Sequence, residues 1–237
     1  MQTYLPAYHI RPVGDQVIEI GFGNRMDPGL NAQVVALYQS LRQDPLPGIT
    51  EMVPAYSSLA IFYDPGFSSG RLSVYESLER ALEERIMQPL PTGSVTGKEV
   101  RVPVCYDPAL VPGLNDASRL LGLDIDAIIR LHTAPVYRVY MNGFLPGFPY
   151  MGEVDSQITM ARKPKPERVP AGSVGIAGKQ TGIYPMDAPG GWHIIGRTPL
   201  KIFDADREEA VLLQAGDSVQ FYPVSKTQFD NWYSQES

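Results

Sequence analysis

The fold is decided by residues 143–199, GFLPGFPYMGEVDSQITMARKPKPERVPAGSVGIAGKQTGIYPMDAPGGWHIIGRTP. Of these 57 residues 18 are glycine or proline, about a third, whereas the whole chain of 237 residues has 22 glycines and 22 prolines. Such density prevents long helices and is typical of short strands joined by tight turns. Because aromatic and β-branched residues recur throughout the stretch, it predicts a packed β-barrel or sandwich rather than disorder.

The residues before this stretch continue the same domain. A strand is expected over residues 99–106, short helices over 116–121 and 124–131, and another strand over Val136–Asn142. His132 extends the apolar stripe of the second helix, so we interpret it as a buried core histidine. The domain is expected to span residues 98–225.

The first third of the chain has a different pattern. Residues 15–20 alternate as a half-buried strand does, and Asp27-Pro28 is typical of a helix start. Strands over residues 50–56 and 59–63 and a helix over 72–87 complete a β-α-β-β-α order. This order predicts a small α/β domain over residues 1–90, with a ferredoxin-like arrangement. With a linker at residues 89–97, the expected fold class is α+β.

Composition excludes several classes of protein. The net charge is −6 and the pI about 5.1, which argues against a nucleic-acid binder. No window approaches a membrane span, and the N-terminus lacks a secretion signal, so we expect a cytoplasmic protein. A single cysteine, Cys105, and three histidines far apart in sequence predict no disulfide and no metal centre.

The charge is unevenly distributed. Residues 1–97 carry 6 basic and 10 acidic side chains, whereas residues 136–201 carry 8 basic and 4 acidic ones. A cationic stretch within an acidic chain favours a small anionic ligand over a polyanion.

The strand Val136–Asn142 supplies the first candidate site. Strict alternation would place Arg138, Tyr140 and Asn142 on one face, where they could bind a carboxylate, amide or phosphate. An ordinary solvent-facing strand surface is the alternative, and the pattern leaves both open.

The loop after this strand is aromatic. Phe144, Phe148 and Tyr150 lie among glycines and prolines, which predicts a rigid apolar rim. We expect this rim to contact a partner protein.

The last strand of the stretch adds a second polar face. Alternation would place His193 and Arg197 on the same side, where Arg197 would be a further cation and His193 an acid or base. A structural hydrogen-bonding role for His193 stays open. Arg138, His193 and Arg197 are therefore our candidate catalytic residues.

The segment Gly172–Gly182 could bind an anion through backbone N–H groups. It matches neither a phosphate loop nor a nucleophile elbow, because the required glycines and helix are absent. With Tyr140 and Asn142, we assign its Ser173, Lys179, Gln180 and Thr181 as candidate substrate- or nucleotide-binding residues.

Several longer motifs resemble one family. They are Arg130–Thr133, Tyr137–Tyr140, Gly143–Tyr150, Val169–Gly178, Gln180–Pro185, Pro189–Trp192 and Gly196–Pro199. Together with Gly14-Asp15, Val53–Leu59 and Tyr63–Pro65, they resemble the KipI family, formerly called allophanate hydrolase subunit 1, which includes the B subunit of bacterial 5-oxoprolinase. The similarity is essentially full length.

This resemblance implies an N-terminal α/β domain and a C-terminal cyclophilin-like β-barrel. It implies two partners, a KipA-type C subunit together with an A subunit, and 5-oxoproline as the substrate converted to glutamate. ATP, with Mg²⁺, would be shared with those partners. The chain lacks a Met-Lys-Met motif, so no covalent biotin is expected on it.

Two other functions remain possible within the resemblance. One is a KipI-type inhibitor of a sensor histidine kinase. The other is a component of a urea-carboxylase-like carboxyltransferase. The motifs do not separate these functions from that of the 5-oxoprolinase subunit.

Overall fold

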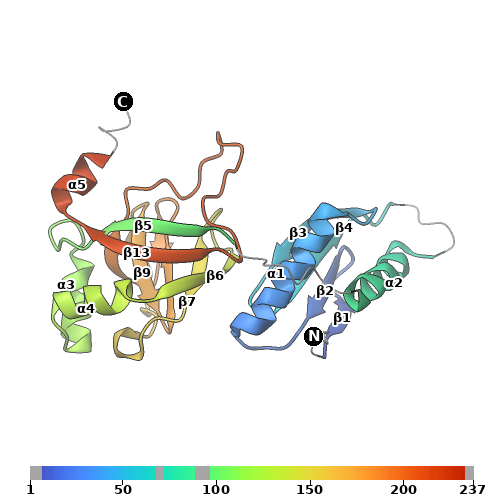
Figure 1. The fold of residues 1–237 in the computed structure, drawn as a ribbon, viewed down its shortest axis with the longest axis horizontal. Helices are drawn as coiled ribbons and strands as arrows, with labels where there is room; N and C mark the ends of the chain where they lie inside the picture. The colour runs from blue at the N-terminus through green and yellow to red at the C-terminus, as the bar shows by residue number, and fades with distance from the viewer. Residues whose placement is uncertain (1–6, 68–71, 89–96, 233–237) are drawn as a thin grey trace. The chain divides into compact units, whose positions relative to one another are not determined.

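The computed structural model describes residues 7–67, 72–88 and 97–232 (Figure 1). The chain forms two compact units, Met1–Thr96 and Gly97–Ser237. Except for Gly97, the predicted linker 89–97 lies outside the described residues.

The first unit is a four-stranded antiparallel sheet with two helices. Its elements are β1 (His9–Pro12), β2 (Val17–Gly21), α1 (Pro28–Gln43), β3 (Ile49–Pro54), β4 (Ser58–Tyr63) and α2 (Val74–Met87). The strand order is β1-β2-β4-β3. Since β4 lies between β2 and β3, the segment β2-α1-β3 is the split β-α-β unit that the sequence predicted. Strand β1 was missed because it is only four residues long and lacks alternation.

Both helices start at side-chain caps. Asp27 accepts a hydrogen bond from the Leu30 N–H at 3.0 Å, and Pro28 occupies the first turn of α1. Ser73 and Glu76 form a reciprocal capping box at the start of α2. The apolar stripes of the two helices pack on one face of the sheet. The buried residues of this core include Leu30, Val34, Leu37, Leu41, Leu78, Leu82, Ile86, Ile18, Ile20, Leu59 and Ile61.

The second unit contains a closed barrel of seven strands. In order around the barrel they are β10 (Gln180–Ile183), β7 (Pro149–Gly152), β6 (Val136–Asn142), β13 (Ser218–Val224), β5 (Glu99–Cys105), β12 (His193–Arg197) and β9 (Ser173–Ala177). Its core is filled by side chains that alternate inward, including Val102, Val104, Tyr137, Val139, Val174, Ile176, Val219 and Phe221. The predicted α+β class with a β-barrel is confirmed.

Short elements cover the barrel. They are α3 (Gly113–Leu121), α4 (Ile125–Thr133), the pair β8 (Glu167–Val169) and β11 (Ala188–Gly190), and α5 (Lys226–Asp230). The start of α3 packs tightly on β12, because a Cβ at Gly113 would lie 2.8 Å from the Ile194 carbonyl oxygen. Glycine at this position therefore sets the spacing between helix and strand. Within the described ranges, no helix is long and apolar enough to cross a bilayer.

His132 is a core residue, as predicted. The Thr181 hydroxyl donates to the Gly175 carbonyl at 3.1 Å, so its oxygen accepts from His132 Nε2–H at 2.9 Å. The Tyr106 hydroxyl then donates to Nδ1 at 2.8 Å. Burial lowers the pKa of His132 to about 3, which keeps the ring neutral.

Candidate functional site

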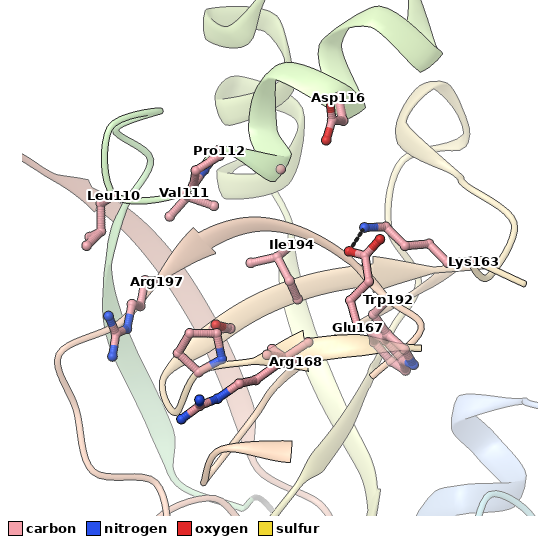
Figure 2. A pocket seen from close by; sticks show the side chains of 14 residues that line it. Leu110, Val111, Pro112, Asp116, Lys163, Glu167, Arg168, Trp192, Ile194 and Arg197 are labelled. Carbon is pink, nitrogen blue, oxygen red and sulfur yellow. Dashed lines mark hydrogen bonds and ion pairs between the residues drawn. The ribbon is translucent and has the colours of Figure 1, made fainter. Parts of the chain in front are cut away.

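A cavity of about 290 Å³ lies where the start of α3 meets β8, β9 and β12. Its polar lining consists of Asp116, Lys163, Glu167, Arg168, Ser173 and Arg197. Figure 2 shows Arg197 at one end of the cavity, the Lys163–Glu167 pair at the other, and Asp116 above them on α3. This size lies at the lower limit for small-molecule pockets.

A β-bulge in β12 determines which side chains reach the cavity. Ile194 lies opposite Gly175 and Gly196 opposite Val174, so Ile195 is the extra residue. Arg197 lies opposite Ser173 and lines the cavity with it, whereas His193 does not line it. The expectation that His193 and Arg197 share a face is wrong, because the bulge breaks the alternation. His193 donates from Nε2 to the Ala161 carbonyl at 2.9 Å.

Most charged groups of the cavity have a partner of opposite charge. Lys163 Nζ lies 2.7 Å from Glu167 Oε2, and Arg168 Nη2 lies 3.0 Å from Asp187 Oδ2. Asp116 pairs with Arg119 one turn further along α3. A hydrogen bond from the Ala171 N–H, together with Arg168, lowers the pKa of Asp187 below its usual range.

Arg197 is held differently. Its Nε donates to the Ala171 carbonyl at 2.9 Å, and its guanidinium carbon lies 5.8 Å from the centre of the Phe229 ring. Among the cavity cations in the described part of the chain, it alone has no carboxylate within 4.0 Å. These contacts fix the orientation of the Arg197 side chain, and its positive charge is not neutralised by a carboxylate.

The remaining lining is apolar. It comes from the segment that leads into α3, from β8 and the residue after it, and from the start of β12. It comprises Leu110, Val111, Pro112, Gly113, Val169, Pro170, Trp192 and Ile194. A cavity with one cationic end, acidic groups and an apolar wall is suited to a small ligand with both charged and apolar parts.

The predicted polar face of β6 does not form. Val139 and Met141 pair with consecutive residues of β7, so a bulge at Tyr140 breaks the alternation there too. Tyr140 is buried, and Asn142 Nδ2 donates to the Leu213 carbonyl at 2.9 Å. Arg138 is half-buried, and burial lowers its pKa.

Arg138 and Arg197 do not share a pocket. Around the closed barrel, β6 is separated from β12 by β13 and β5 on one side and by β7, β10 and β9 on the other. Arg138 faces outward, because its strand neighbours Tyr137 and Val139 lie in the core. Arg197 faces outward because it follows Gly196, where a Cβ would point at the core residues Val104 and Tyr106. Arg138 and Arg197, two of the three candidate catalytic residues, therefore do not belong to one site.

The predicted phosphate-binding segment forms a hairpin. Ala177 pairs with Gln180, so Gly178 and Lys179 are its two-residue turn, with Gly178 at φ +59°. Lys179 is exposed and lies 3.7 Å from Glu153, while Thr181 is fully buried against His132. Ser173 is thus the one residue of the predicted segment that lines the cavity.

The aromatic rim is partly core. The Phe148 ring is 1% exposed and packs on Tyr184 and Trp192, with centroid distances of 5.1 and 5.3 Å. The expectation of an exposed Phe148 is wrong, because these rings enclose it. Phe144 is 57% exposed with φ +67°, and Tyr150 is half-buried.

Asp116, Lys163, Arg168 and Trp192 line the cavity but were not predicted as site residues. Arg168 reaches it through the pairing of β8 with β11, and Lys163 is placed by a hydrogen bond from its backbone N–H to the Gly191 carbonyl. Neither contact leaves a local signal in the sequence. The sequence does carry a local signal for the bulge in β12: Gly196 interrupts an apolar strand, and glycine within a strand often marks a bulge.

The described lining of the cavity offers no donor set for a metal ion. The described residues contain no group of three or more His, Cys, Asp or Glu side chains that could hold one. Asp116 and Glu167 are each engaged by a basic side chain. The described lining of the cavity therefore does not fit Mg²⁺.

Comparison with known proteins identifies the family. Residues 8–213 match the model "Carboxyltransferase domain, subdomain C and D". The chain is 39% identical to the B subunit of 5-oxoprolinase from Bacillus subtilis, covering 97% of this chain and 98% of the relative. It is 38% identical to the protein of that name from Escherichia coli O157:H7, covering 75% of this chain and 79% of the relative.

Among solved structures, the crystal structure of TTHA0988 matches with a TM-score of 0.77 at 38% identity. It covers 92% of this chain, whereas this chain spans only 40% of TTHA0988. The fold, the family model and the curated relatives agree. The chain belongs to the family of carboxyltransferase C and D subdomains that includes the 5-oxoprolinase B subunits.

Proposed function

We propose that this chain is the B subunit of a 5-oxoprolinase. It acts in the cytoplasm with two partners, an A subunit plus a KipA-type C subunit. The observation that carries the proposal is the end-to-end match with the Bacillus subtilis protein, 39% identical over 98% of its length. The names of the curated relatives favour this enzyme subunit over the kinase inhibitor.

The proposed reaction opens the lactam ring of 5-oxoproline to give glutamate. A lactam amide is a poor electrophile, and ATP supplies the activation of its carbonyl group in the complete enzyme. The described residues contain no group of three or more acidic, His or Cys side chains for Mg²⁺, and Gly178 and Lys179 form a hairpin turn instead of a phosphate-binding loop. We therefore assign ATP binding to the partner proteins and expect no turnover from this chain alone.

Co-expression with both partners tests the proposal. Purified complex, each pair of proteins and the single chain are incubated with 5-oxoproline and ATP, and glutamate and phosphate are measured. Glutamate release by the complete complex alone supports the proposal. An assembled complex of all three proteins that releases no glutamate overturns it.

Carboxyltransferase activity is the second candidate, because the matching family model carries that name. Biotin would then arrive on another protein, since this chain has no Met-Lys-Met motif. Carboxyl transfer from a carboxybiotinylated carrier, measured on the same complex, distinguishes the two functions.

A further inference from the structure

We propose that the cavity between α3 and strands β8, β9 and β12 binds a small cyclic carboxylate that also carries an amide N–H, with its carboxylate on Arg197. The inference deepens the proposed function and rests on it, because 5-oxoproline belongs to this chemical class. It assigns substrate binding to this chain rather than to a partner.

Arg197 provides the carboxylate contact. Its Nε is bound to the Ala171 carbonyl, and its planar group lies 5.8 Å from the centre of the Phe229 ring. Within the described residues, its two Nη nitrogens make no hydrogen bond or ion pair. A guanidinium fixed in this way offers paired N–H donors, the geometry that a carboxylate accepts.

A chain of contacts holds Arg197 in place. Asp187 Oδ2 accepts from Arg168 at 3.0 Å, and Asp187 Oδ1 accepts from the Ala171 N–H at 2.9 Å. The carbonyl of Ala171 is the group that orients Arg197. Asp187 is therefore a positioning residue, which acts on the ligand through Ala171 and Arg197.

The rest of the cavity selects the kind of anion. Asp116 and Glu167 add two carboxylates to the lining, which would repel a polyphosphate but can accept a hydrogen bond from an N–H group. Trp192 and Ile194 provide an apolar surface for ring methylenes. A single negative charge, an N–H donor and an apolar ring together match the lining.

Isothermal titration of the full chain tests this assignment. Three probes are used: 5-oxoproline, pyrrolidin-2-one, which is the same lactam without the carboxylate, and inorganic phosphate. We expect saturable binding of 5-oxoproline and at least tenfold weaker binding of both other probes. A tenfold loss is on the order of the effect of removing one charge-assisted contact. Equal affinity for either of the other two overturns the proposal, as does the absence of saturable 5-oxoproline binding.

Matched variants locate the site. Arg197→Met keeps an unbranched stem over Phe229 and should weaken 5-oxoproline binding about tenfold or more. Arg101→Met is the control, because Arg101 on β5 also packs over an aromatic ring, Tyr222 at 4.9 Å, but does not line the cavity. An unchanged Kd in Arg197→Met overturns the assignment.

A melting curve of each variant checks the fold. If Arg197→Met does not fold, Asp187→Asn serves instead; it should weaken binding severalfold, and an unchanged Kd there overturns the proposal. The outcome is separable from that of the proposed function. An active complex in which this chain binds no 5-oxoproline overturns only this inference, whereas 5-oxoproline binding by this chain within an inert complex overturns only the function.

Discussion

Arg138 and Arg197 lie on opposite sides of the barrel, three strands apart in the order β6-β13-β5-β12. Only Arg197 lines the cavity, opposite Ser173 of β9. The two arginines therefore have different environments, although both belong to the cationic part of the sequence.

The first prediction follows from this separation. In the reconstituted complex, Arg197→Ala should raise the KM for 5-oxoproline about tenfold or more, since it removes a charge-assisted contact to the substrate. Arg138→Ala should leave that KM within about twofold, because Arg138 does not line the cavity. Steady-state kinetics of both variants check this. A KM raised equally by both changes would contradict the separation.

The second prediction concerns Phe148. Its ring is enclosed by Tyr184 and Trp192, so Phe148→Ala should lower the free energy of unfolding by about 3–5 kcal/mol. Phe144→Asn should change it by no more than about 0.5 kcal/mol, because the ring is exposed and Asn tolerates the positive φ. Urea unfolding of both variants measures the difference, and similar losses would refute it.

The third prediction addresses the partner contact. Phe144 combines an exposed ring with a strained backbone, features that are common in binding loops. Phe144→Asn should weaken copurification with the C subunit without changing stability. Leu120→Asn is the control, since Leu120 is a similarly exposed apolar residue on α3, 62% exposed. Unchanged assembly of Phe144→Asn would place the interface elsewhere.

The fourth prediction is a pH dependence of stability. The pKa of His132 is lowered to about 3 in the folded chain from an ordinary 6.5, so below pH 6.5 the unfolded chain binds a proton that the folded chain does not. The free energy of unfolding should therefore fall by about 1.4 kcal/mol per pH unit below pH 6.5.

Urea unfolding at pH 7 and pH 5 measures the contribution of His132 to the free energy of unfolding. Both pH values lie above the range in which ordinary carboxyl groups titrate. The wild-type chain should lose about 2 kcal/mol between the two values. His132→Leu should be less stable at pH 7, because Tyr106 and Thr181 lose a partner, but should show a flatter pH dependence. An equal slope in both proteins would show that His132 is not responsible.

Local signals predicted the elements well. Asp27-Pro28 marked the start of α1, Asp124 caps α4 by accepting from the Ala127 N–H, and the glycine- and proline-rich stretch indicated the barrel. Each of these signals acts over a few neighbouring residues. Short stretches of sequence are therefore sufficient to detect them.

The site was less predictable, because it depends on register and on long-range pairing. Bulges at Tyr140 and Ile195 reverse the side-chain faces beyond them, so alternation assigned the wrong partners to Arg138 and His193. Arg168 joins the cavity only through the pairing of β8 with β11. The sequence identified Ser173 and Arg197 as candidate site residues, but it did not predict that they line the same cavity.

The most direct test of the central claim is glutamate release from 5-oxoproline and ATP by the purified complex of this chain with its two partners. We expect turnover by the complete complex, none when this chain is omitted, and none from this chain alone. Full turnover by the two partners without this chain, or no turnover by the assembled complex, would contradict it.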